Sequence, residues 1–152
     1  ASTKAKQEQM FRAQLELALE LDLPVIVHDR EAHGDSLRIV CDYPQLRGVF
    51  HCYSGSAEMA KWLIARGWYI GFTGVLTFKN ARKAVETAAA IPLDRIVLET
   101  DCPYMAPEPV RGPRCDSSLI RYVGEYIAQL KGISAKEAFR TTAENARQVY
   151  SL

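Results

Sequence analysis

The segment Pro24-Val-Ile-Val-His28 indicates the fold class, because its pattern returns three more times along the chain. The later copies are Gly48-Val-Phe-His-Cys52, Tyr69-Ile-Gly-Phe-Thr-Gly74 and Arg95-Ile-Val-Leu-Glu-Thr-Asp101. Short runs that are rich in β-branched and aromatic residues are typical of strands buried on both faces. We therefore predict a buried strand at each of these four places.

Helical patterns separate and follow the predicted strands. They predict helices from Lys4 to Asp22, up to about Asp42, over 57–65 and 81–90, and two more on either side of Gly132. The last of these opens with Ser134-Ala-Lys-Glu137, a capping-box pattern. Strands that alternate with single helices form a parallel sheet with right-handed crossovers. The fold is therefore α/β, and four βα units fit either an open sheet or half of an eight-stranded barrel, for which ~250 residues is usual.

The composition is that of an ordinary globular protein. The chain has 152 residues, a formal charge of +1, 48% hydrophobic and 24% charged residues. These values exclude a disordered, collagen-like or coiled-coil chain, and also a polycation that would hold nucleic acid by bulk charge alone. The apolar runs are shorter than the ~20 residues of a membrane span, and no signal-peptide pattern opens the sequence. We expect a soluble, cytoplasmic protein with a single domain over residues 1–152 and no membrane partner.

Four cysteines are spread along the sequence, at positions 41, 52, 102 and 115, without a C-x-x-C pair. Zinc ribbons bring their ligands in close pairs, and small disulfide scaffolds are much denser in cysteine. We therefore expect reduced thiols that are buried or half-buried.

Polar side chains stand at the carboxyl ends of three predicted strands, namely His28, His51 and Asp101. Both α/β architectures place their chemistry at this end of the sheet. A shared divalent cation would explain three such groups, because imidazole nitrogen and carboxylate oxygen are ligands for zinc and manganese. Hydrogen-bonded core histidines are the alternative. Glu99 shares a strand face with Asp101, so it is either a group beside the site or an ion-pair partner in the core.

A long loop rich in proline and glycine follows Asp101 and runs to Arg114. Long loops at strand ends often carry function. His33 lies past the first strand, and we expect it at the surface or in a helix cap. Tyr53 and Tyr104 flank the strand-end groups, where they would either stack on a base or pack with one edge in solvent.

Four blocks of this sequence, in order, resemble signature blocks of the TatD family of metal-dependent deoxyribonucleases. They are 24–32 (PVIVHDREA), 49–56 (VFHCYSGS), 67–79 (GWYIGFTGVLTFK) and 98–112 (LETDCPYMAPEPVRG). The resemblance covers nearly the whole chain. It implies a TIM-barrel fold, of which this chain holds about the C-terminal half, and hydrolysis of DNA phosphodiesters by metal-activated water.

The resemblance also implies roles for individual residues. His28, His51 and Asp101 match metal ligands, so the implied cofactors are divalent cations such as Zn, Mn or Mg, with DNA as the substrate. Asp101 could also accept a proton from the attacking water. Arg111 and Gly112 match an Arg-Gly loop suited to phosphate, although a loop-anchoring arginine fits equally well. Lys79 is a further phosphate contact or a solvated lysine.

This sequence also departs from the family pattern. It lacks the family's early His-x-His pair and the glutamate that bridges two metals, and Cys115, Asp116 and Ser117 replace an Asn-Glu-Pro pattern. We expect weak metal binding and impaired nuclease activity from these 152 residues alone. We also expect that the chain either self-associates through its open sheet edges or leaves its sheet partly frayed. An amidohydrolase-like enzyme acting on a small ester or amide, or a non-catalytic half-barrel, are the alternatives.

Overall fold

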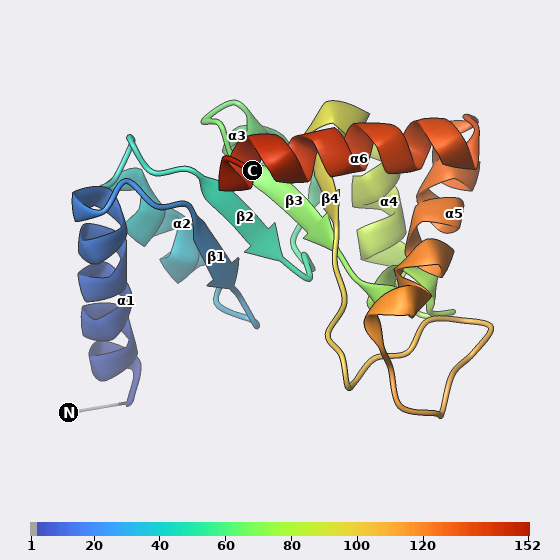
Figure 1. The fold of residues 1–152 in the computed structure, drawn as a ribbon. Helices are drawn as coiled ribbons and strands as arrows, with labels where there is room; N and C mark the ends of the chain where they lie inside the picture. The colour runs from blue at the N-terminus through green and yellow to red at the C-terminus, as the bar shows by residue number, and fades with distance from the viewer. Residues whose placement is uncertain (1–2) are drawn as a thin grey trace.

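The computed structural model describes residues 3–152, which form one parallel sheet with helices packed around it (Figure 1). The strands are β1 (Val25–His28), β2 (Gly48–His51), β3 (Tyr69–Phe72) and β4 (Ile96–Leu98). They lie in the order β1-β2-β3-β4, and every neighbouring pair is parallel. The predicted α/β fold with a parallel βα repeat is confirmed.

Helices occupy the segments that the periodicity indicates. They are α1 (Thr3–Glu20), α2 (His33–Cys41), α3 (Ala57–Ile64), α4 (Arg82–Ala90), α5 (Ile120–Lys131) and α6 (Ala135–Tyr150). Short 3-10 turns are η1 (Gly74–Thr77), η2 (Leu93–Arg95) and η3 (Ser117–Leu119). The predicted cap at Ser134 is present, because its hydroxyl accepts a hydrogen bond from the Glu137 amide at 3.1 Å.

Two strands end earlier than the sequence pattern predicts. β3 stops at Phe72, and the Thr73 hydroxyl then accepts a bond from the Val75 amide, which starts η1 instead of continuing the ladder. β4 stops at Leu98, and the Glu99 amide makes one more bond to the Phe72 carbonyl at 3.0 Å. Since β3 offers no partner beyond Phe72, the chain from Glu99 to Asp101 leaves the sheet.

The two faces of the sheet are covered differently. One face carries Phe50, Ile70 and Phe72 into the main core, which it shares with residues of α2 to α5 such as Leu63 and Ile127. On the opposite face, a smaller cluster joins Val49, Tyr69 and Val97 to Val149 of α6. Figure 1 shows α6 crossing the end of the sheet where the strands begin. The amino ends are therefore closed, and the carboxyl ends are left to loops.

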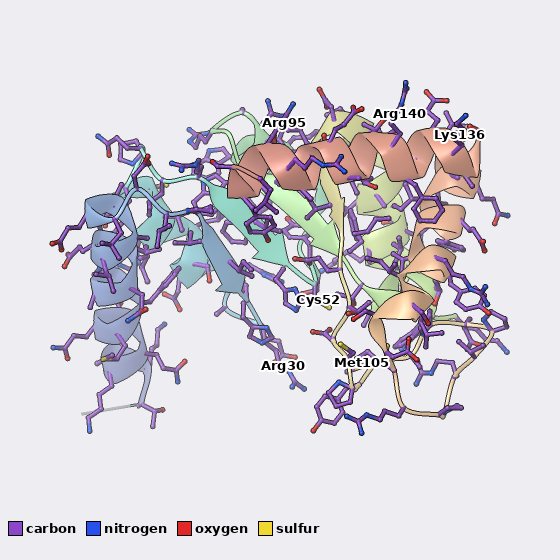
Figure 2. The ribbon with its side chains drawn as sticks, viewed as in Figure 1. Arg30, Cys52, Arg95, Met105, Lys136 and Arg140 are labelled. Atoms are coloured by element: carbon purple, nitrogen blue, oxygen red, sulfur yellow. The ribbon has the colours of Figure 1, made fainter. Side chains whose placement is uncertain are left out.

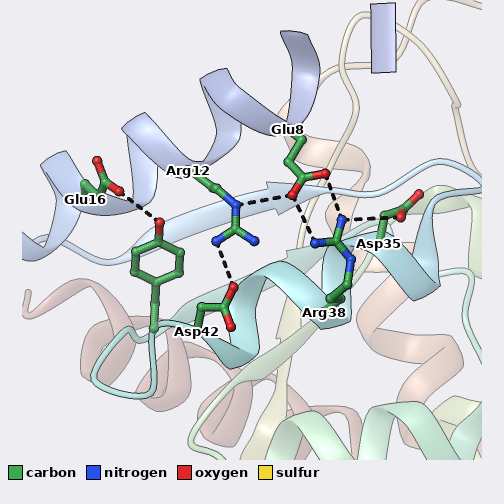
Figure 3. Close-up of polar contacts among 7 residues, drawn as sticks. Glu8, Arg12, Glu16, Asp35, Arg38 and Asp42 are labelled. Atoms are coloured by element: carbon green, nitrogen blue, oxygen red, sulfur yellow. Dashed lines mark hydrogen bonds and ion pairs between the residues drawn. The ribbon is translucent and has the colours of Figure 1, made fainter. Parts of the chain in front are cut away.

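α1 lies at the β1 edge and is tied to α2 by charged side chains (Figure 3). Glu8 accepts from both terminal nitrogens of Arg38, at 3.0 and 2.8 Å, and from Arg12 at 3.3 Å. Arg12 also pairs with Asp42 at 2.8 Å. These bonds join α1 to α2 across a partly exposed surface, and they hold the pKa of Glu8 down at about 2, chiefly through Arg38.

All four cysteines are free thiols. Cys115 is buried and Cys52 half-buried, as expected, but Cys41 and Cys102 are exposed, so the prediction is wrong for these two. Cys41 ends a surface helix and Cys102 begins the long loop, and neither place is covered by another element. None of the helices in residues 3–152 is both long and apolar enough to cross a membrane. The single domain over 1–152 stays a prediction.

Candidate functional site

The register of β1 and β2 brings the two predicted histidine ligands side by side. His28 ends β1 and pairs directly with His51, which ends β2. Their ring centroids lie 6.1 Å apart, and the rings are tilted by 37°. His28 is exposed and His51 half-buried. The carboxyl edge of the sheet therefore holds both imidazoles, as the strand pattern predicts.

His51 lies between two carboxylates that come from the far side of β3. Its Nδ1 is 3.0 Å from Oε2 of Glu99, and its Nε2 is 2.8 Å from Oδ1 of Asp101. An imidazole can donate to two acceptors only when both nitrogens carry a proton. The hydrogen bond that His51 donates to Glu99 is the main cause that raises the pKa of His51 to about 9, against the opposing effect of burial. In this arrangement His51 is an imidazolium held by two acids.

Glu99 is more than a neighbour of the site. Besides its ion pair with His51, its Oε2 accepts a bond from the Cys52 amide at 3.3 Å. The carboxylate lies against Gly71 of β3, where an added Cβ would overlap its Oε2 and Cδ atoms. The structure shows Glu99 paired with His51, and its role as a group beside a metal site stays a prediction. The missing side chain at Gly71 provides the space for the Glu99 carboxylate.

The chemistry of these side chains suits a divalent cation. Two imidazoles and two carboxylates at one sheet edge are nitrogen and oxygen donors of the kind that zinc and manganese accept. Among residues 3–152, however, no three His, Cys, Asp or Glu side chains surround one common point. The Asp101 carboxylate instead forms an ion pair with His51, because opposite charges at half-buried positions attract each other. The ligand set His28, His51 and Asp101 stays a prediction.

Cys52 follows His51 in a left-handed backbone conformation, with φ of 45°. Its Sγ lies 3.2 Å from Oγ1 of Thr73, which is buried. Burial raises the pKa of the Cys52 thiol to about 11. The thiol is therefore protonated at neutral pH and is a poor nucleophile.

The predicted phosphate-binding residues lie on the loops that follow β3 and β4. The Arg111 guanidinium carbon stands 3.7 Å from the centroid of the Phe78 ring, and Lys79 comes next in the sequence. Gly112 has φ of 105°, a conformation that residues with a Cβ rarely adopt. The Arg111 side chain thus connects the loop after β4 to the loop after β3, as a loop-anchoring arginine would. Arg111, Gly112 and Lys79 are all exposed, and their contact with phosphate stays a prediction.

Other polar side chains near this edge have structural roles. His33 is the first residue of α2, and its Nδ1 lies 2.9 Å from Oδ2 of Asp29. Tyr53 is buried, and its hydroxyl donates to the Ser56 carbonyl at 2.8 Å. Tyr53 therefore has no free face for a base. Sequence reasoning missed the role of Gly71, although a glycine inside a strand is a recognised sign of close approach by another group.

Comparisons with known proteins show the family of the chain. The family model of TatD related DNases matches residues 1–151. An uncharacterized metal-dependent hydrolase of Bacillus subtilis, YabD, is 40% identical over 99% of this chain and 60% of its own length. A protein of Erwinia tasmaniensis named 3'-5' ssDNA/RNA exonuclease TatD is 35% identical over 99% of this chain and 61% of its own length.

Solved structures show the same fold. The TatD homolog YJJV of Escherichia coli K12 superposes with a TM-score of 0.89 at 29% identity, covering 97% of this chain and 57% of that one. The chain spans about three fifths of the length of the curated relatives it matches. The predicted correspondence to part of a (β/α)8 barrel is confirmed. With a family model matched over nearly its entire length and the strand-end histidines and acids on one edge, the chain belongs to the family of TatD related DNases.

Proposed function

We propose that this chain carries part of the catalytic edge of a divalent-metal-dependent hydrolase that cleaves DNA phosphodiester bonds. The observation that carries the proposal is the position of His51, which lies beside His28 and contacts Glu99 and Asp101 at the carboxyl end of the sheet. This is the end at which barrel enzymes of this type perform their chemistry. The name of the Erwinia tasmaniensis relative, a 3'-5' ssDNA/RNA exonuclease, supports a nucleic-acid substrate.

Each residue at this edge has a proposed role. His28, His51 and Asp101 would hold a cation such as Zn, Mn or Mg. When bound, this cation would lower the pKa of a water molecule at the site. Asp101 would accept the proton from that water, and Glu99 would orient His51 through its Nδ1. Arg111 and Lys79 would contact the phosphodiester, with Gly112 shaping the loop. Cation binding would require His51 to lose a proton, because a ligating imidazole is neutral.

The proposal is tested by calorimetric titration of the chain with Mn²⁺ and Zn²⁺. We expect weak binding by the unmodified chain, and binding at least ~10-fold weaker after His51→Ala. His33→Ala is the matched control, because the His33 side chain hydrogen-bonds to Asp29, so the substitution should leave the affinity unchanged. An affinity that His51→Ala does not alter would remove the metal site from this edge.

Substrate class is tested on the same preparation. A single-stranded oligonucleotide and a small carboxyl ester are offered separately, since metal-activated water can attack either bond. We expect slow cleavage of the oligonucleotide and none of the ester. Fast turnover of the oligonucleotide by the 152-residue chain would contradict the expected impairment, and cleavage of the ester alone would contradict the phosphodiester assignment.

The β1 edge supports self-association of the chain. Within residues 3–152, β1 is an edge strand that pairs with β2 on one side, so its other side offers unpaired backbone groups. Ile26 of β1 is 59% exposed, and Leu21 and Leu23 before it are exposed as well. A cavity of about 580 Å³ lies between α1, β1 and α2 beside this edge. A second copy of the chain would cover these apolar side chains and extend the sheet.

A further inference from the structure

Two large apolar side chains are exposed close to the catalytic edge, and both belong to the loop that follows Asp101. Tyr104 is 72% exposed and Met105 is 49% exposed. Within residues 3–152, the other exposed large apolar side chains lie on α1, on the segment from α1 through β1, and at the last residue of the chain. Figure 2 shows Met105 projecting from this loop beyond the ends of the strands, at the same end of the sheet as Cys52 and Arg30.

Backbone contacts hold the start of this loop close to Asp101. The Tyr104 amide donates to the Asp101 carbonyl at 2.8 Å, which closes a tight turn directly after the predicted metal ligand. The Pro103 carbonyl accepts a bond from the Cys115 amide at 3.0 Å, and Cys115 is buried. The Tyr104 side chain is therefore exposed from a fixed backbone position beside the proposed reaction centre.

Packing also fixes the loop tip, Tyr104 and Met105, on its C-terminal side. Ala106 and Pro107 are buried, and the Glu108 amide donates to Oγ1 of Thr77 at 2.8 Å. An added Cβ at Gly74 would overlap the Met105 carbonyl oxygen, so the two backbones are in close contact. Because the tip is anchored on both sides, the exposure of Tyr104 and Met105 is a stable feature of the surface.

The surroundings of the tip favour a nucleic acid over an apolar partner. The same loop carries Arg111 and Arg114, both exposed, and Lys79 lies on the neighbouring loop that Arg111 contacts through Phe78. Neither arginine forms an ion pair within residues 3–152. An exposed aromatic ring among available cations is the combination with which proteins hold single strands, since bases stack on the ring while cations follow the phosphates.

We propose that the Tyr104 ring is a stacking platform for one unpaired base of a single-stranded nucleic acid, next to the phosphodiester at Asp101. The inference rests on the proposed phosphodiester function and adds a residue that selects single strands. In the interior of a duplex a base is already stacked on both faces, so it offers no face to the ring. Met105 lies beside the platform and adds apolar contact at its edge.

The test compares two short oligonucleotides of equal length and equal phosphate charge, one oligo-dT and one with abasic sites throughout. Binding is measured by fluorescence anisotropy with EDTA present, so that no hydrolysis occurs. We expect Tyr104→Ala to weaken binding of oligo-dT about 10-fold and to leave the abasic strand unaffected. Tyr104→Phe keeps the ring and should bind as the unmodified chain does. Met10→Ala removes another exposed apolar side chain, on α1, and should change neither affinity.

The outcomes separate this inference from the function on which it rests. If the unmodified chain binds both strands with the same affinity, or if Tyr104→Ala weakens both equally, the stacking role is overturned while phosphodiester binding stands. If the unmodified chain binds neither strand, the proposed function and the platform are overturned together.

Discussion

Gly71→Ala is the substitution that tests the candidate site most directly. The new methyl group would occupy the place of the Glu99 carboxylate, which lies against Gly71. Glu99 would have to move away, and its bonds to His51 and to the Cys52 amide would be lost. A substitution on β3 is therefore expected to separate Glu99, which follows β4, from His51 at the end of β2.

The expected magnitude follows from the bonds that are lost. A hydrogen bond to a charged group contributes about 1.5–3 kcal/mol, and the longer bond from the Cys52 amide adds less. Replacing glycine by alanine at a compatible site stabilises the folded state by about 0.4–1 kcal/mol, because it lowers the conformational entropy of the unfolded chain. We therefore expect Gly71→Ala to lower the free energy of unfolding by about 1–3 kcal/mol.

Urea unfolding of a double-mutant cycle measures this effect. Gly71→Ala is compared in the unmodified chain and in Glu99→Ala, where the new methyl group meets no carboxylate and should cost little. Gly34→Ala is the matched control, because Gly34 lies in α2 with open space around its Cβ position, and the substitution should stabilise the chain slightly. Equal costs of Gly71→Ala in both backgrounds would refute the reasoning, since the destabilisation would then not arise from Glu99.

Three further predictions concern other parts of the molecule. Glu8→Gln should destabilise the chain at pH 6.5, because Arg38 lowers the pKa of Glu8 from 4.5 to about 2, and this stabilisation is complete above pH 4.5 and lost as the pH falls toward 2. The urea midpoints of the two proteins should therefore converge as the pH falls from 4.5 to about 2, and a difference that stays constant would contradict the assignment. Asn145→Ala should lower the free energy of unfolding by about 2–4 kcal/mol, because Nδ2 of this buried side chain donates to two backbone carbonyls, at 2.9 and 2.7 Å. Urea unfolding checks it, and a cost below about 1 kcal/mol would show that water replaces both bonds. Ile26→Lys should shift sedimentation velocity profiles toward the monomer, because a charge on the β1 edge opposes strand pairing; an unchanged distribution would argue against association at β1.

The local elements of this protein could be read from its sequence because their signals are local. The run ending at His28 and its three later copies are β-branched and aromatic over a few residues, so they mark strands without reference to the rest of the chain. Ser134 caps its helix through a bond to an amide three residues away. Strand ends were predicted less well, because where β4 stops depends on the length of β3 beside it.

The parallel βα repeat, the family, and the positions of His28 and His51 at strand ends follow from local sequence patterns, whereas Asp101 lies three residues past the end of β4. Only the tertiary structure decided that Glu99 holds His51 and that Gly71 makes room for it. It also decided that Tyr53 is buried while Tyr104 is exposed. These contacts join residues far apart in the chain, and they depend on register, since a shift of one residue would turn each strand side chain to the opposite face. Periodicity shows which face a residue occupies within its own strand, but the packing of β2, β3 and β4 selects the partner that it meets there.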